Sequence, residues 1–541
     1  MVSTAGRLPP SNWLKALEKG LLDSQLRNNV GDDSSLLAEH KNVLDRALRG
    51  YLAGFGDSRG VSVVRAPGRI NLIGMHVDHR GGCVNPIAIK ETVVVASPRQ
   101  DDRVNLANDN PSFPARDFRI SEELAGKPVV DWDDWTAKNI HSLAERGLNG
   151  DWSNYCRAAG CYLANLLWKE KDLPPAAFKG MDAYVASNMP MAVGLSSSST
   201  LVVSIALLFS LFNDREFDDT SMIDHCGTAE WFVGTRGGKG DHAAIILSRQ
   251  GKITQIAFFP FETRNLSFPK EYRVVVCNSL VLSRKGETTR HAFNERIASY
   301  EIGFLLLKKI AAASGLDESS IRMLRDLNQQ NLGLSDSDIL QLLLELPERV
   351  GRKEVEAELG AEHGEIIRKL WQTHPEPEGG YPIRDVCLFG VAECMRARLT
   401  AGILEKQGIK QFGRLMNISH DGDRVTRLYG ERQVPWKSSF TGETLNTHSE
   451  GKPLLHLQPG GYRVSTPQID LLVDLCLETD GVLGARLTGA GHGGCVAVLV
   501  HQDAVKPLLA KLVKGYYAPR DSSCSAEVCQ PLAGANFYRA P

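Results

Sequence analysis

The sequence lacks the features that would assign it to several specialised classes of protein. Its 541 residues carry 62 Lys and Arg against 64 Asp and Glu, so no overall positive charge favours nucleic acid or an anionic membrane as a partner. The longest apolar run, at 201–212, is shorter than the roughly 20 residues that cross a bilayer. The N-terminus has no continuous apolar region of a secretory signal, so we expect a cytoplasmic protein.

Cysteine usage argues against a disulfide framework. The 11 cysteines are an odd number, are scattered along a long chain and form no CxxC pair, which indicates reduced thiols. Hydrophobic residues make up 43% and charged residues 23% of the chain, which are ordinary values for a globular protein. Because a single core stops growing well below this length, we expect at least two domains.

Hydrophobic periodicity predicts a mixture of strands and helices. The predicted strands lie at 61–67, 92–99, 181–187, 253–261 and 272–279, and the predicted helices lie within 12–54, 152–168, 201–212, 297–313, 386–418 and 468–477. We place a change of domain near 262–271, between two of the predicted strands. A charge-rich, mainly helical stretch follows at 319–372, and 430–463 is polar and irregular.

The segment NMPMAVGLSSSST at 188–200 is the first candidate site. A predicted strand precedes it and an apolar helix follows, so Gly194 and the serines lie where unpaired backbone N–H groups and the positive end of the helix point outward. This geometry binds phosphate. A serine-rich linker or an ordinary helix cap is the alternative, and the absence of Gly-Lys-Ser/Thr excludes a Walker A loop.

The segment RAPGRINLIGMHVDHRGG at 65–82 concentrates arginine, histidine and aspartate in a strand and turn whose glycines permit close approach to a ligand. A turn with solvated charges is the alternative. The spacing of His76, His79 and His242 is not diagnostic of a transition-metal site, and we do not predict one.

Two further segments carry candidate residues. GTRGGKGDHAAI at 234–245 puts Asp241 after a flexible turn. GARLTGAGHGGCVAVLV at 484–500 is rich in glycine, but its glycines lead into a predicted strand and do not open a helix. A dinucleotide-binding fingerprint is therefore excluded.

Taken together, APGRINLIGMHVDH, PMAVGLSSSST and LTGAGHGGC resemble the motifs of the GHMP small-molecule kinases, and within them of the galactokinase branch. The resemblance implies an α+β fold of two domains, a ribosomal protein S5 domain 2-like N-terminal domain and a ferredoxin-like C-terminal domain. It implies a helical N-terminal extension at 1–59, domains at 60–268 and 269–541, and insertions near 318–385 and 430–463.

The resemblance also implies a reaction, the transfer of the γ-phosphoryl group of ATP to the anomeric hydroxyl of galactose or a galacto-configured sugar. Its partners are then the sugar and ATP, with Mg²⁺ as cofactor, and no protein partner is indicated. By motif position Asp241 accepts the proton with Arg69 beside it, which suits a reaction that needs mainly alignment and charge neutralisation. The implied ATP-binding residues are Gly194, Leu195, Ser196, Ser197, Ser198, Gly489 and Gly491; the sugar-binding residues are Met75, His76, Asp78, Gly240 and Phe293; the metal ligands are Ser198 and Glu230.

Three departures from the family pattern concern the nucleotide side. The family's metal-binding glutamate stands five residues before the glycine matched by Gly234, whereas Glu230 stands four before it. On a helix this is a rotation of about 100°, so either the helix is locally adjusted or water replaces the carboxylate. Ala192 replaces the first glycine of the serine loop, and His242 stands where galactokinases usually have Gln.

Two departures concern the sugar. Met75 replaces the glutamate of the family's G-E-H-x-D-Y run, and Phe293 stands at a family tyrosine. A buried 6-hydroxyl facing Met75 would lack a partner at a cost of about 1–3 kcal/mol, which favours a sugar altered at C6. The chain would then be an arabinokinase or a galacturonokinase, unless Met75 is a neutral change in a true galactokinase. A galacturonate carboxylate would need a cation, for which the candidates are Arg80, Lys239, Arg284 and Lys285.

An alternative of another class is a non-catalytic sensor of sugar and ATP on the same fold. Arg69 and Asp241 argue against a sensor, whereas the offset of Glu230 and the long insertions leave it open. Measuring ADP release with a panel of sugars separates the two hypotheses.

Overall fold

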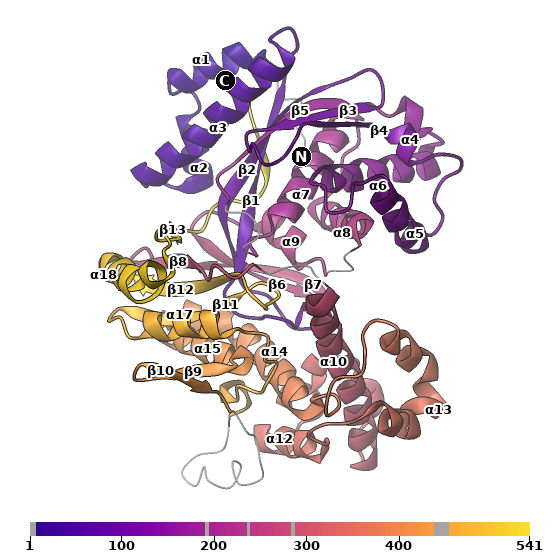
Figure 1. Ribbon diagram of the computed structural model, residues 1–541, viewed down its shortest axis with the longest axis vertical. Helices are drawn as coiled ribbons and strands as arrows, with labels where there is room; N and C mark the ends of the chain where they lie inside the picture. The colour runs from indigo at the N-terminus through magenta and orange to yellow at the C-terminus, as the bar shows by residue number, and fades with distance from the viewer. Residues whose placement is uncertain (1–6, 190–193, 235–237, 283–286, 438–453) are drawn as a thin grey trace.

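The computed structural model describes residues 7–189, 194–234, 238–282, 287–437 and 454–541. Two halves, each built on its own sheet, are stacked along the long axis of the molecule (Figure 1). None of the helices in these ranges is both long and apolar enough to cross a membrane.

The N-terminal half is built on a six-stranded sheet in the order β14-β1-β2-β5-β3-β4. Its strands are β1 (Ser62–Asn71), β2 (Pro86–Pro98), β3 (Arg103–Asn108), β4 (Arg116–Arg119), β5 (Met181–Ser187) and β14 (Asn536–Tyr538). Strands β3 and β5 run parallel, and the other neighbours are antiparallel. The last strand of the chain, β14, thus pairs with the first strand, although the predicted boundary at 268/269 assigns residues 536–538 to the C-terminal domain. That boundary stays a prediction.

Helices cover both faces of this sheet (Figure 1). One layer is α1 (Pro10–Glu18), α2 (Asp23–Val30) and α3 (Ser34–Phe55); the other contains α4 (Ile120–Glu123), α5 (Trp132–Glu145), α6 (Ser153–Lys171), α7 (Ser197–Phe212), α8 (Asp219–Ala229) and α9 (Gly240–Leu247). The first layer buries Trp13 and Leu44 against Val63 of β1, which explains the helical periodicity before residue 54. Helix α7 is buried almost all round, as its apolar run predicts, and begins at Ser197.

The C-terminal half contains a four-stranded antiparallel sheet in the order β11-β12-β8-β13. Its strands are β8 (Tyr272–Asn278), β11 (Val482–Thr488), β12 (Cys495–His501) and β13 (Ala526–Cys529). Two separate two-stranded sheets are formed by β6 (Lys252–Phe258) with β7 (Phe261–Ser267) and by β9 (Thr426–Tyr429) with β10 (Arg432–Pro435). The predicted glycine turn therefore joins β11 to β12.

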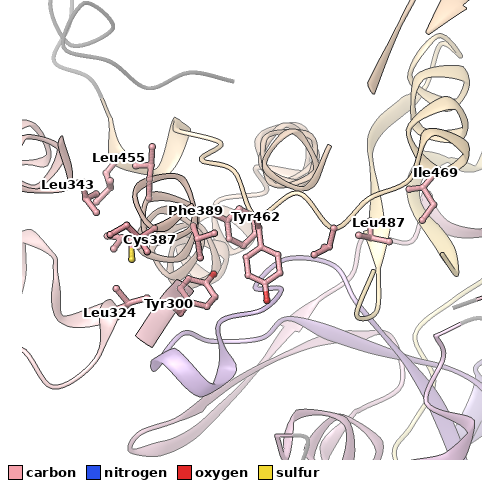
Figure 2. Packing of buried hydrophobic residues seen from close by; sticks show 14 of the residues in the cluster. Tyr300, Leu324, Leu343, Cys387, Phe389, Leu455, Tyr462, Ile469 and Leu487 are labelled. Carbon is pink, nitrogen blue, oxygen red and sulfur yellow. The ribbon is translucent and has the colours of Figure 1, made fainter. Parts of the chain in front are cut away.

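Among the described residues of this half, the α-helices are α10 (Glu287–Ala313), α11 (Gln329–Leu332), α12 (Asp336–Glu345), α13 (Arg352–Trp371), α14 (Ile383–Glu405), α15 (Ile409–Asp423), α17 (Pro467–Leu477) and α18 (Val505–Leu512). The predicted insertion near 318–385 forms the helices α11 to α13, and α10 and α14 pack together beside it. Tyr300, Phe389 and Tyr462 lie side by side in the core of this half (Figure 2).

Candidate active site

Three segments that are far apart in the sequence meet at Asp241. Nε of Arg69 donates to Oδ1 of Asp241 over 2.8 Å, and Nη2 of the same guanidinium lies 2.7 Å from that oxygen. The Ser196 hydroxyl donates to Oδ2 of the same carboxylate. Nη1 of Arg69 donates to the carbonyl oxygen of Gly194 over 2.8 Å. The structure therefore brings the predicted proton acceptor, its arginine and the serine loop into one cluster.

The local backbone explains why Arg69 lies against the serine loop. The pairing of β1 with β2 shifts register between Pro67 and Gly68, and the Arg69 N–H then donates to the carbonyl oxygen of Leu195 over 3.2 Å. A Cβ built on Gly68 would lie 2.8 Å from that same oxygen. Because any larger residue would push the loop away, the glycine of APGR is required for this contact.

Asp241 lies in the first turn of α9, directly after Gly240. Its side chain is 36% exposed, whereas that of Arg69 is 14% exposed, so the carboxylate remains open to a ligand. The carboxylate of Asp78, in the short 3-10 helix η1 (Asp78–Arg80), lies against the same turn, and a Cβ built on Gly240 would lie 3.3 Å from its Oδ2. Burial raises the pKa of Asp78, but the hydrogen bond and charge of His79 outweigh it and leave the pKa below its usual value.

The serine loop has the geometry of an anion cradle. Ser196 has a left-handed backbone conformation with φ of 61°, and Ser197 and Ser198 occupy the first turn of α7, where backbone N–H groups have no partner within the helix. The glycine turn of the other half abuts this loop, because a Cβ built on Gly489 would lie 3.5 Å from Cα of Gly194. Gly491 is packed more tightly but against another segment, because its added Cβ would lie 2.6 Å from the carbonyl oxygen of Val464. Ala192 lies outside the described residues.

Glu230 reaches the serine loop through a change of helix type. Helix α8 ends at Ala229, and Glu230 begins the 3-10 helix η3 (Glu230–Val233), so the helix type changes at this residue. Oε2 of Glu230 accepts a hydrogen bond of 2.8 Å from the Ser199 hydroxyl, and Nε2 of His242 lies 2.8 Å from the same oxygen. The Glu230 carboxylate is thus bound by Ser199, which follows Ser198 in the sequence.

The sugar-side residues differ in how they are placed. Met75 is 6% exposed, and its sulfur accepts a hydrogen bond of 3.3 Å from Nδ2 of Asn71. The His76 ring stacks on Tyr462, with 4.3 Å between ring centroids, so this side chain is committed to the C-terminal half. Phe293 is 37% exposed on α10, one turn before Ile297.

Two of the four candidate cations for a sugar carboxylate already have acidic partners. Nη1 of Arg80 lies 2.6 Å from Oε2 of Glu301, and Nζ of Lys239 donates to Oδ1 of Asp224 over 2.5 Å. Arg284 and Lys285 lie outside the described residues. Among the described candidates, both positive charges are therefore offset by a carboxylate.

A buried ionic cluster beneath the 74–80 loop was not predicted from the sequence. Glu393, Arg396, Asp423 and Arg486 all have side chains with 0% exposure. The acidic and basic pair at positions 393 and 396 follows the apolar run at 386–392 and is the sequence signal that could have revealed it, because a charged pair on a buried helix needs specific partners.

Comparison with known proteins agrees with this geometry. The galactokinase galactose-binding signature matches residues 50–98, the GHMP kinase N-terminal domain matches 155–249, and the GHMP kinase C-terminal region matches 442–518. A galactokinase of Dictyostelium discoideum is 26% identical over 494 residues, which cover 86% of each chain. A galactokinase of Roseiflexus is 27% identical, covering 87% of this chain and 92% of its own.

The fold has a solved counterpart. The crystal structure of Lactococcus lactis galactokinase complexed with galactose superimposes with a TM-score of 0.61 and 21% sequence identity, over 90% of this chain and 98% of that one. The matched regions contain Arg69, the serine loop with Asp241, and the glycine turn, and the structure brings these segments into contact. The three family models and the galactokinases that match most of the chain therefore support a sugar kinase of the GHMP, galactokinase-like type.

Proposed function

We propose that this chain phosphorylates the anomeric hydroxyl of galactose or a galacto-configured sugar, with Asp241 as proton acceptor and Arg69 as the positive charge beside it. The observation that carries the proposal is that Arg69 and Ser196 both bind the Asp241 carboxylate at the edge of the serine loop. A carboxylate oxygen has two lone pairs, so Oδ2 can accept a further hydrogen bond from the sugar hydroxyl. Asp241 then takes the proton of the hydroxyl as the sugar oxygen bonds to the γ-phosphorus, and the bond from that phosphorus to the β,γ-bridging oxygen breaks to release ADP.

ATP lies in this proposal between the serine loop and the glycine turn. Gly194 and Ser196 to Ser198 present backbone N–H groups to the phosphates, and Gly489 and Gly491 close the other side. The donors suit Mg²⁺, because the Ser198 hydroxyl and the Glu230 carboxylate are hard oxygen ligands on adjoining turns. When bound there, Mg²⁺ offsets the negative charge of the phosphates.

The acceptor in this proposal is a neutral sugar. Glu301 and Asp224 already offset the charges of Arg80 and Lys239, which weighs against galacturonate. Met75 and Phe293 offer no carboxylate or hydroxyl to a 6-hydroxyl group, which leaves arabinose and a 6-deoxy sugar as alternatives to galactose. Asp78 and His76 complete the sugar side, His76 through its main chain because its ring packs on Tyr462.

The test is an acceptor panel. The release of ADP is measured with ATP and Mg²⁺ in the presence of galactose, arabinose, fucose, galacturonate or N-acetylgalactosamine. A neutral galacto-configured sugar is expected to give the highest kcat/KM. If no sugar raises ADP release although sugar and ATP both bind, the proposal fails and the protein is a sensor; if galacturonate is preferred, the neutral acceptor is wrong.

A further inference from the structure

The loop that carries the sugar-side residues is attached to the opposite half of the molecule. The backbone N–H groups of Gly74 and Met75 both donate to Oε1 of Glu393 on α14, over 2.7 and 3.1 Å. The loop follows β1 of the N-terminal half, whereas α14 belongs to the C-terminal half. One carboxylate oxygen thus joins the two halves at the base of the loop.

Glu393 is built to stay ionised in a fully buried position. Its side chain is 0% exposed, Oε2 accepts from Nε of Arg396 over 2.7 Å, and the Ser419 hydroxyl lies 2.8 Å from both carboxylate oxygens. Nη1 of Arg486 lies 3.3 Å from Oε1. Burial raises the pKa of Glu393, but Arg396 and Arg486 outweigh it and hold the pKa at about 2. An ionised carboxylate is a stronger acceptor for backbone N–H groups than a neutral group.

A second attachment lies next to the first. The ring of His76 stacks on Tyr462, and its Nε2 lies 3.6 Å from Oδ1 of Asp423. Asp423 is in turn 3.3 Å from Nη2 of Arg486, the same guanidinium that approaches Glu393. Tyr462 lies with Phe389 and Tyr300 beside the part of the N-terminal half that is drawn in violet (Figure 2). Gly74, Met75 and His76 are therefore all held by one buried cluster.

We propose that Glu393 is a positioning residue for the acceptor, which fixes the loop carrying Met75 and Asp78 without touching the sugar itself. This inference rests on the proposed function. Asp78 lies at the far end of the loop, against the turn before Asp241, so a displacement at Gly74 and Met75 is transmitted to the sugar side of the site. The direct contacts of the serine loop, with Arg69 and Gly489, do not include Glu393. Acceptor affinity, and not ATP affinity, depends on this carboxylate.

The test compares Glu393→Gln with Glu123→Gln. Glu123 is a matched control, because it is also a buried carboxylate bound by two arginines, with Oε1 at 2.7 Å from Arg146 and 2.9 Å from Arg157, and it lies on α4 of the N-terminal half. Glu393→Gln is expected to raise KM for the sugar about tenfold, while KM for ATP stays within about twofold. Glu123→Gln is expected to leave both constants within about twofold. An equal rise in both constants for Glu393→Gln would overturn the proposal.

Hydrogen exchange supplies a readout that does not depend on turnover. Amide exchange in a peptide covering residues 72–80 is expected to become about tenfold faster in Glu393→Gln and to stay unchanged in Glu123→Gln. Equal exchange in the two variants contradicts the proposal. If wild-type protein phosphorylates no sugar, the proposed function fails, but the exchange comparison still tests the role of Glu393.

A milder variant covers the case in which Glu393→Gln does not fold. Ser419→Ala removes the hydroxyl that donates to the Glu393 carboxylate and accepts from Nη1 of Arg486, and it keeps the loop residues and both arginines themselves. The expected result is a rise of about threefold in KM for the sugar, with KM for ATP unchanged. An unchanged KM for the sugar, or a matching change in KM for ATP, counts against a positioning role.

Discussion

Two clusters of charged side chains, around Asp241 and around Glu393, differ in access to solvent and in number of partners. Asp241 is 36% exposed and has Arg69 and Ser196 as partners. Glu393 is 0% exposed and has partners on every side. A charge that must meet a ligand keeps an open face, whereas a charge that holds two parts of the chain together is saturated. Removing one partner of a buried ion pair lowers the free energy of unfolding by about 3–5 kcal/mol. The residues of the Glu393 cluster are therefore needed for the stability of the fold.

The first prediction, with the largest expected effect, concerns Asp241→Asn. Without a proton acceptor, kcat is expected to fall about 1,000-fold, while ATP affinity changes by less than about twofold, because the residue acts on the sugar. The measurements are ADP release and ATP titration by calorimetry. Asp134→Asn is the control, since Asp134 pairs with Lys138 on the exposed face of α5. A comparable loss of ATP affinity in Asp241→Asn would show that the role is misassigned.

The second prediction concerns Arg69→Lys, which keeps the positive charge but replaces the guanidinium, with its several N–H donors, by a single ammonium group. The guanidinium binds Asp241 and the Gly194 carbonyl at once, over 2.8 Å each, and a single ammonium group cannot reproduce both contacts. We expect kcat/KM to fall about 100-fold. Arg49→Lys, at a 58% exposed ion pair on α3, is the control and should be neutral. Near-wild-type activity of Arg69→Lys would mean that only the charge matters.

The third prediction concerns the buried cluster and uses the variant Asp423→Asn. Burial raises the pKa of Asp423 to about 7, with Arg486 opposing. An unfolded aspartate releases its proton near pH 4, so the native state binds more protons between about pH 4 and 7 and the contribution of this group to stability falls as pH rises through that window. The groups that influence Asp423 are His76, Arg486, Glu393, Asp470 and Arg396.

Asp423→Asn removes this titration. The unfolding free energy of the variant, relative to wild type, is therefore expected to increase by about 1–3 kcal/mol between pH 5 and pH 8. Denaturant unfolding of both proteins at the two pH values measures it. A difference that is the same at both pH values would show that Asp423 is ionised throughout.

The smallest expected effect is that of Met75→Glu. Restoring the family glutamate should raise kcat/KM for galactose relative to arabinose about tenfold, because the 6-hydroxyl gains an acceptor. Phe293→Tyr is a companion variant that is expected to act in the same direction. Parallel assays with the two sugars give the ratio, and an unchanged ratio in Met75→Glu means that this side chain does not face C6.

The sequence predicted the elements that carry the candidate site because each has a strong local signal. The predicted strand at 181–187 coincides with β5, and the apolar helix at 201–212 is most of α7. The charges beneath the loop were missed, because Glu393, Asp423 and Arg486 belong to three different elements whose sequences show no common pattern. The strand β14 was missed because three residues carry too little periodicity.

By itself, the sequence determined which chemical groups are available: a serine loop before a helix, an aspartate after a glycine turn, and an arginine at a strand bend. These are local properties, set by residue type and spacing. Only the tertiary structure decided that Glu230 reaches Ser199 through a 3-10 turn, that Arg80 and Lys239 have acidic partners, and that a carboxylate of one half holds the loop of the other. Such contacts depend on which surfaces pack together, and packing brings together residues about 320 positions apart, as it does for Gly74 and Glu393.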